Sequence, residues 1–235
     1  MRFLTPEPHR RELLRFAETQ RSPEVAGPFL PLEPEGYREA KKRIMFIGKA
    51  TAGEFGNDRP VSADSVQDLV SRVLEDDAAR PASPFWNFIA RVTSGVLGID
   101  QLSVKEALRS VIWNNLIKVG RARGNPTGEL LKAQRNLAIG CLESEVERAD
   151  PQIVVLMTNN YEICVWANAL SLKWNDSASW AAAGVRGDRG AIWLARQRNR
   201  MTFWCRHPQG KSRAWLEHVV KFIVTEATSK PTSAT

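Results

Sequence analysis

The sequence predicts an α/β protein with three layers, in which helices cover both faces of a central, mainly parallel sheet of four strands. Two observations support this fold class. Short, continuous apolar runs occur within residues 43–47, 110–119, 153–157 and 201–205, and each is bounded by charged residues, glycine, asparagine or proline, as buried strands are. Amphipathic segments of helical length separate these runs, and strands that alternate with helices usually pair in parallel.

The first apolar run leads into a loop that is rich in small residues. Ile44–Ile47 is followed by Gly48, Ala50, Gly53 and Gly56. Such a loop lets a ligand approach the backbone, because glycine has no Cβ and tolerates positive φ. Ligands of open α/β sheets bind outside the carboxyl ends of the strands. The loop is therefore a candidate floor for a functional site, although an ordinary strand-to-loop turn would have the same composition.

Helices are expected between and around these strands, and their starts carry capping signals. Ser62 and Ser212 can each cap a helix, Ser103 with Glu106 fits a capping box, and Pro84 suits a first helical position. The expected helices span residues 8–19, 63–74, 85–97, 129–149, 160–170 and 213–223, with a further short helix after Ser103. Residues 191–194 could add an edge strand.

Length and composition predict one cytoplasmic domain. The 235 residues fit a single domain over 1–228, with an N-terminal helical extension over 1–40 and a flexible tail over 229–235. No apolar run approaches the length of a membrane span, and the charged, proline-containing start is unlike a secretory signal. The three cysteines are far apart and without CxxC spacing, which predicts reduced core residues. We expect a monomer without metal or organic cofactor.

The charge balance favours a polyanionic partner. The net charge is +7 and the isoelectric point about 9.6, and nucleic acid is the first candidate for such a chain. Arg121, Arg123, Lys211 and Arg213 fall mostly in expected loops. Tryptophans are interleaved with the later basic residues, and bases can stack on aromatic rings beside a basic groove. A solvated basic face above buried tryptophans is the simpler alternative.

Three polar features should meet at one edge of the sheet, because all carboxyl ends of parallel strands lie there. They are the loop from Gly48 to Asn57, the pair Asn114 and Asn115 in the second strand, and His207 after the last strand. The two asparagines point to opposite faces. An amide carries both donor and acceptor, which suits reading the edge of a nucleobase, and a histidine can donate to charge on a leaving group. A structural histidine and backbone-bonded asparagines are the alternatives.

A hydrolytic reaction at this edge would also need a group that holds water. Glu54, Asn57 and Asp58 in the first loop are the candidates. Each of them could equally be a solvated loop residue.

Three segments, in this order, resemble the uracil-DNA glycosylase superfamily: FIGKATAGEFG, VIWNNLIKVGRARGNP and FWCRHPQGKSR. The resemblance implies that the first loop carries the water-activating group. It implies that Asn115, or in second place Asn114, reads a flipped base, and that His207 stabilises the departing base. Phe85 within SPFWNF, or Phe55, would supply the ring on which the base stacks.

The resemblance implies a monofunctional DNA glycosylase that hydrolyses the N-glycosidic bond of a damaged or modified base and leaves an abasic site. DNA is then the partner, and base excision in DNA repair or antiviral defence the context. Gly48 and Ala50 would form the floor of the base pocket. Lys49, Arg121, Arg123, Lys211, Ser212 and Arg213 would contact DNA, the last three by holding phosphate or probing the duplex.

The chain departs from the family pattern at four positions. Ala50 stands where several branches have an acid or asparagine, Lys49 where others have glutamate, Thr51 where proline is usual, and Gln209 where serine is usual. A glycosylase for bulky modified bases of phage DNA, or a nucleic-acid-binding member without catalysis, are therefore alternatives. An unrelated enzyme for a phosphorylated substrate is disfavoured, because no GxGxxG motif or P-loop is present.

Overall fold

The computed structural model describes residues 1–20, 22, 24–51, 62–76, 83–173, 181–185, 188–197 and 199–229. The strands are β1 (Arg2–Phe3), β2 (Val25–Ala26), β3 (Leu32–Glu33), β4 (Ile44–Ala50), β5 (Val111–Ile117), β6 (Gly120–Arg121), β7 (Ile153–Met157), β8 (Ala181–Val185), β9 (Asp188–Gln197) and β10 (Arg200–Cys205). The helices are α1 (Glu7–Thr19), the 3₁₀ turn η1 (Glu35–Tyr37), α2 (Ala63–Glu75), α3 (Pro84–Leu97), α4 (Val104–Leu108), α5 (Gly128–Ala149), α6 (Ile163–Ala169) and α7 (Arg213–Thr228).

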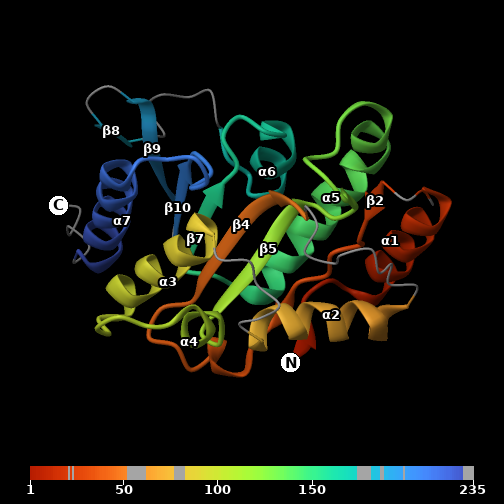
Figure 1. Cartoon of the computed structure of the whole chain (residues 1–235), viewed down its shortest axis with the longest axis horizontal. Coiled ribbons are helices and arrows are strands. Elements are labelled where there is room, and N and C mark those ends of the chain that lie inside the picture. The colour runs from red at the N-terminus through yellow and green to blue at the C-terminus, as the bar shows by residue number, and fades with distance from the viewer. Residues whose placement is uncertain are drawn as a thin grey trace.

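The main sheet is mainly parallel, as predicted, but it is larger than predicted. Its six described strands have the order β5-β4-β7-β10-β9-β8 (Figure 1). The four strands β5, β4, β7 and β10 pair in parallel, and β9 and β8 extend the sheet in antiparallel fashion. The four expected parallel strands are present; of the two further strands, β9 contains the expected edge segment and β8 was not expected. The segment 191–194 lies within β9, which is an interior strand, and β8 forms the edge.

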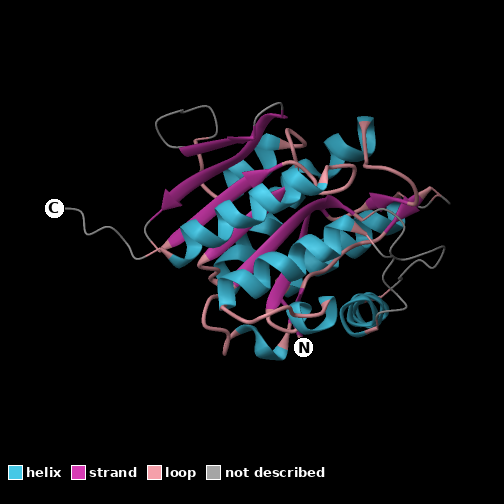
Figure 2. Ribbon diagram, turned by 60° about the vertical axis from the view of Figure 1, so that its left-hand side comes forward, coloured by secondary structure: helices cyan, strands magenta, loops and turns pink. Residues whose placement is uncertain are grey.

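The parallel strands are buried on both faces, which explains why each reads as a continuous apolar run. Every residue of β5 and β7 is buried. Their side chains alternate between two cores. Residues such as Phe46 and Val155 pack with α2, α3 and α7, while Ile47 and Leu156 pack with α5 and α6. Helices thus cover both faces of the sheet, as Figure 2 shows.

Local signals in the sequence set the helix boundaries. The Ser62 and Ser212 hydroxyls accept hydrogen bonds from main-chain N–H groups at the third residue of their helices, at 3.2 Å each. Ser103 and Glu106 form both halves of the capping box. These contacts satisfy N–H groups that have no partner within a helix.

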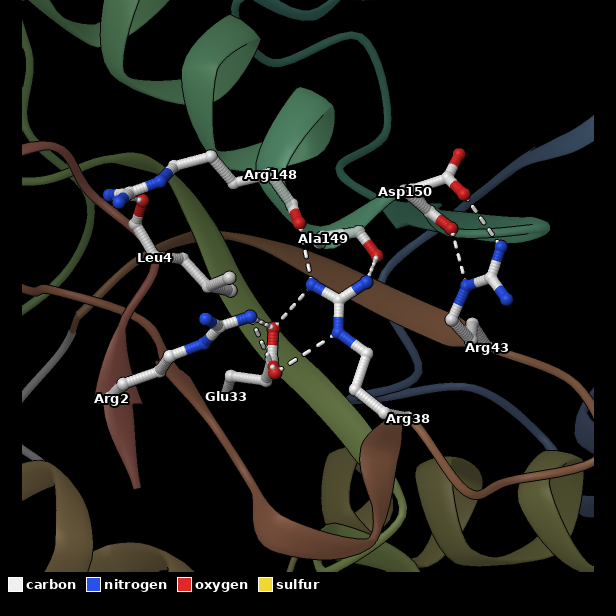
Figure 3. A network of polar contacts seen from close by, with 8 residues as sticks. All are labelled: Arg2, Leu4, Glu33, Arg38, Arg43, Arg148, Ala149 and Asp150. Carbon is white, nitrogen blue, oxygen red and sulfur yellow. Dashed lines mark hydrogen bonds and ion pairs between the residues drawn. The ribbon is translucent and has the colours of Figure 1, made fainter.

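A network of arginines anchors the end of α5 to the start of the chain (Figure 3). The Arg38 guanidinium donates to the main-chain carbonyls of Arg148 and Ala149 at 2.6 and 3.2 Å, and to the buried Glu33 carboxylate at 2.6 and 3.1 Å. Burial opposes ionisation of Glu33, yet hydrogen bonds from Arg38 and Arg2 lower its pKa overall. A cation at the last helical carbonyls also complements the helix dipole. The network therefore joins the C-terminal end of α5 to β3 and to the segment that precedes β4.

The cysteines match the expectation only in part. Cys141 and Cys205 are buried thiols, whereas Cys164 is exposed, with its thiol 3.7 Å from the Glu162 carboxylate. The prediction of three core cysteines is wrong for Cys164, because its position on α6 faces outward.

In the described ranges, no helix is long and apolar enough to span a membrane.

Replacing Arg38 with alanine should lower the free energy of unfolding by about 1 to 3 kcal/mol, because the buried Glu33 loses its main partner and two helix-end carbonyls lose their donor. Urea denaturation measures this change. Arg11→Ala is the matched control, since Arg11 is exposed and pairs with Glu7 of its own helix. Equal effects of the two substitutions would contradict the structural role of Arg38.

Candidate functional site

The parallel register brings Gly48 and Asn115 side by side near the carboxyl ends of β4 and β5. The two residues are directly paired. A Cβ placed on Gly48 would lie 2.6 Å from Asn115 Oδ1 and 3.6 Å from Cε2 of Phe85. Only glycine permits this approach without displacing the amide. Gly48, Asn115 and Phe85 therefore form one contiguous surface.

The Phe85 ring connects this surface to His207. Phe85 is the second residue of α3, and its ring stacks on the His207 imidazole with a centroid separation of 5.3 Å and an interplanar angle of 10°. Trp86 contacts the Phe85 ring edge-on at 4.7 Å. The glycine, amide, aromatic ring and imidazole come from four separate segments and lie in one row at the sheet edge. We call this row of Gly48, Asn115, Phe85 and His207 the rim.

Hydrogen bonds orient the His207 imidazole. Its Nδ1 accepts from the main-chain N–H of Gln209 at 3.2 Å, so in the neutral ring the proton is on Nε2. The main-chain N–H of His207 donates to Asn159 Oδ1 at 2.9 Å. Asn159 follows β7 and adopts a left-handed conformation with φ of 52°. The rim therefore presents Nε2–H as a donor.

Asn159 is a positioning residue that the sequence analysis did not single out. The sequence feature that could have pointed to it is an asparagine just after a buried strand, because asparagine adopts the positive φ of such a turn more readily than most residues. Its main-chain carbonyl also accepts from Trp204 Nε1 at 2.7 Å. Asn159 thus ties the loop after β7 to the loop after β10.

The surroundings of His207 keep its imidazole neutral. Burial, followed by the positive charges of Lys49 and Lys211, lowers its pKa from 6.5 to about 4. Burial and Lys211 also lower the pKa of Lys49. Two lysines and a histidine thus share a region where each cation disfavours protonation of its neighbours.

Asn114 points to the opposite face of β5, as alternation requires, and is bonded there. Its Nδ2 donates to Glu145 Oε2 at 2.9 Å, and its Oδ1 accepts from Lys118 Nζ at 2.6 Å. Lys118 also donates to Glu145 at 2.6 Å, and both of these charged side chains are fully buried. The Thr5 hydroxyl donates to the other Glu145 oxygen. Of the two asparagine candidates, only Asn115 faces the rim.

The predicted DNA contacts lie in different environments. Lys49 and Lys211 are partly buried beside His207, and Arg123 is exposed in the loop after β6. Arg121 lies in β6, where it pairs with Val25 of β2. The Ser212 hydroxyl accepts from the Trp215 main-chain N–H as the cap of α7, and the exposed Arg213 pairs with Glu217 at 2.7 Å.

The first loop is described only at its beginning. Ala50 is half-buried at the end of β4, and Thr51 is fully buried. A Cβ on Gly120 would overlap the Thr51 carbonyl and hydroxyl, so the loops after β4 and β5 pack closely. The candidates Glu54, Phe55, Asn57 and Asp58 lie outside the described residues.

A pocket of about 730 Å³ lies at the other end of the strands, near the starts of β7 and β10. Its charged side chains already have protein partners: Arg200 donates to the Pro151 carbonyl at 3.3 Å, and Asp150 pairs with Arg43 at 2.7 Å. The rim instead holds a buried amide donor, Asn115 Nδ2, that has no hydrogen-bond partner in the described part of the chain, so we place the candidate site there. Across the described ranges, no group of three or more histidine, cysteine or acidic side chains is arranged to hold a metal ion.

Comparison with known proteins gives no match: neither a protein-family model nor a curated protein matches this chain.

Acid should destabilise the protein through His207. Because the folded pKa of about 4 lies below the ordinary 6.5, the unfolded chain binds more protons within this window, and stability is lost as the pH falls through it. At about 1.36 kcal/mol per pKa unit, the loss is roughly 3 kcal/mol. His207→Gln should remove this component, so its stability should fall less between pH 7 and pH 4 than that of the natural protein. Parallel acid dependence of the two proteins in urea denaturation would contradict the buried neutral imidazole.

Glu145→Ala should cost about 3 to 5 kcal/mol of stability, because it leaves the Lys118 ammonium buried without its counter-charge. The matched control is Glu143→Ala, which removes an exposed carboxylate from the same helix and should change stability by about 0.5 kcal/mol or less. Thermal and urea unfolding measure both. A mild effect of Glu145→Ala would mean that Lys118 is not charged in its buried position.

Proposed function

We propose that this protein is a divergent member of the uracil-DNA glycosylase superfamily, a DNA glycosylase that cleaves the N-glycosidic bond of a flipped, modified base and leaves an abasic site. The observation that supports it best is the rim. A base-reading amide, an aromatic ring and a neutral imidazole donor come together over a glycine, although they lie far apart in the chain.

The Asn115 amide is suited to base recognition. Its Nδ2 is buried and has no hydrogen-bond partner within the described part of the chain. An unsatisfied buried donor costs about 1 to 3 kcal/mol, so its presence requires an explanation. An acceptor on the edge of an extruded base would satisfy it. The position of the Asn115 amide against Gly48 then favours bases whose edge presents such an acceptor.

The His207 imidazole is suited to stabilising a leaving base. As the glycosidic bond lengthens, the base gains negative charge and the sugar becomes oxocarbenium-like. The Nε2–H of neutral His207 donates to this developing charge, while stacking on Phe85 fixes the plane of the ring. The pKa of about 4 keeps the proton arrangement unchanged at neutral pH. A water molecule held by Glu54, Asn57 or Asp58 of the first loop then attacks the sugar carbon.

The charges of the rim are suited to DNA. Lys49 and Lys211 stand beside His207, and the chain carries a net charge of +7. Such cations attract the phosphate backbone and favour extrusion of a nucleotide, which itself costs a few kcal/mol. A bulky base of modified phage DNA is the favoured substrate class within this proposal. The half-buried Ala50 leaves more room than the acid or asparagine that related motifs carry at this position.

The test incubates the protein with duplexes carrying different modified bases and with modified phage DNA. Mass spectrometry measures released bases, and alkaline cleavage measures abasic sites. His207→Ala should slow release by about 10²-fold or more, because it removes a donor to the transition state. DNA affinity, measured by gel shift, should stay close to that of the natural protein.

The control is His9→Ala, which changes a histidine of α1 whose Nδ1 lies 3.5 Å from the Ser144 hydroxyl. Its release rate should be unchanged. Equal rates for His207→Ala and the natural protein would refute the role of His207. Tight DNA binding without release from any substrate would favour the non-catalytic alternative.

A further inference from the structure

Three separate segments enclose the pocket near the starts of β7 and β10. Its volume of about 730 Å³ falls in the range of about 300 to 1,000 Å³ that is usual for small-molecule sites. The junction between α5 and β7 contributes Asp150 and Pro151, the end of α6 contributes Ala169 and Leu170, and the turn from β9 to β10 contributes Asn199 and Arg200. This end of the strands is opposite to the rim, so the pocket is separate from the candidate site.

Two side chains of the sheet, Arg200 and Gln197, are fixed at this pocket by hydrogen bonds. They are directly paired in the antiparallel register of β10 and β9, so they lie on the same face of the sheet. Gln197 Nε2 donates to the Ser171 carbonyl at 3.0 Å, which joins the sheet to the end of α6. Arg200 Nε donates to the Pro151 carbonyl at 3.3 Å, which joins β10 to the segment before β7. The position of the guanidinium is therefore set by contacts with the protein.

The Arg200 guanidinium keeps donors available for a ligand. Its contact with Pro151 uses Nε, and its two terminal nitrogens have no hydrogen-bond partner in the described part of the chain. No described carboxylate lies within ion-pair distance of this half-buried side chain. Burial lowers its pKa, and the charge of Asp150 offsets this only in part. A planar guanidinium with both terminal nitrogens available matches a phosphate or carboxylate group in a bidentate manner.

Asp150 adds a hydrogen-bond acceptor to the same pocket. Its Oδ2 accepts from Arg43 Nη2 at 2.7 Å, so a second guanidinium compensates the charge of this carboxylate (Figure 3). Its Oδ1 has no donor among the described residues, and a carboxylate oxygen readily accepts from a hydroxyl group. Two guanidinium groups stand against one carboxylate here, so the positive charge of Arg200 is left uncompensated.

We infer that this pocket binds a small organic anion that carries hydroxyl groups. Arg200 holds its phosphate or carboxylate group, Asp150 Oδ1 accepts from one of its hydroxyls, and Pro151, Ala169 and Leu170 contact its carbon atoms. The inference goes beyond the proposed function and does not depend on it, because the pocket and the rim lie at opposite ends of the strands.

The test titrates the protein with four probes in a calorimeter. Ribose 5-phosphate and gluconate carry hydroxyls together with a phosphate and a carboxylate, ribose lacks the anionic group, and inorganic phosphate lacks the carbon-bound hydroxyls. Ribose 5-phosphate or gluconate should bind with a Kd of about 1 mM or below and should raise the Tm, because a ligand of the folded state stabilises it. Ribose and inorganic phosphate should each bind about tenfold more weakly or not at all.

Two variants of the pocket test where the anion binds. Arg200→Gln should weaken its binding by about tenfold or more, because a charge-assisted hydrogen bond is lost. Asn199→Glu puts a carboxylate at an exposed position of the pocket, where it repels the anion without disturbing the fold, and should weaken binding about fivefold.

Two controls accompany these variants. Arg196→Gln removes an exposed arginine of β9 that pairs with Glu226, and it should leave the affinity unchanged. Lys211→Gln removes a cation beside His207 at the rim, and it should also leave the affinity unchanged. Thermal unfolding without ligand verifies that each variant is folded.

Four outcomes would overturn the inference. They are the absence of binding by both organic anions, equal affinity for ribose and ribose 5-phosphate, undiminished binding in Asn199→Glu and Arg200→Gln, and a loss of binding in Lys211→Gln, which would place the anion at the rim. None of these measurements uses DNA or base release, so the glycosylase proposal is tested separately.

Discussion

The close approach of Gly48 to Asn115 is the contact on which the rest of the site depends. Parallel pairing of β4 and β5 sets these residues directly opposite each other, and the missing side chain lets the amide and the Phe85 ring share the space. Phe85 in turn stacks on His207. A shift of one residue in the register would exchange the faces of β5 and direct Asn114 toward the rim in place of Asn115.

The opposite face of the same strand supplies a rigid support. Asn114, Lys118 and Glu145 bond to one another without solvent, and the Asn115 main-chain N–H donates to Asn114 Oδ1 at 2.7 Å. This bond connects the buried charges to the backbone of the residue that faces the rim. A fully satisfied buried network resists deformation, because breaking one member leaves the others unpaired. The network thereby restrains the backbone of Asn115 from the opposite face of β5.

Environment, more than residue type, separates the chemical roles of the ionisable groups. Lys118 is fully buried against a carboxylate and is structural, whereas Lys49 is partly buried beside another cation. His207 is held neutral by burial and by both nearby lysines. The two lysines therefore also help to keep the imidazole a neutral donor.

The sequence by itself determined the α/β class, the four parallel strands and most helix boundaries, because apolar runs and serine caps are local signals. It also placed the loop from Gly48, the pair Asn114 and Asn115, and His207 at one sheet edge, because strands that alternate with helices pair in parallel and share the edge of their carboxyl ends. Only the tertiary structure decided that Asn114 joins Lys118 and Glu145, that Asn159 holds the His207 loop, and that β9 lies inside the sheet with β8 at its edge. These depend on contacts between residues far apart in the chain, which no local pattern encodes.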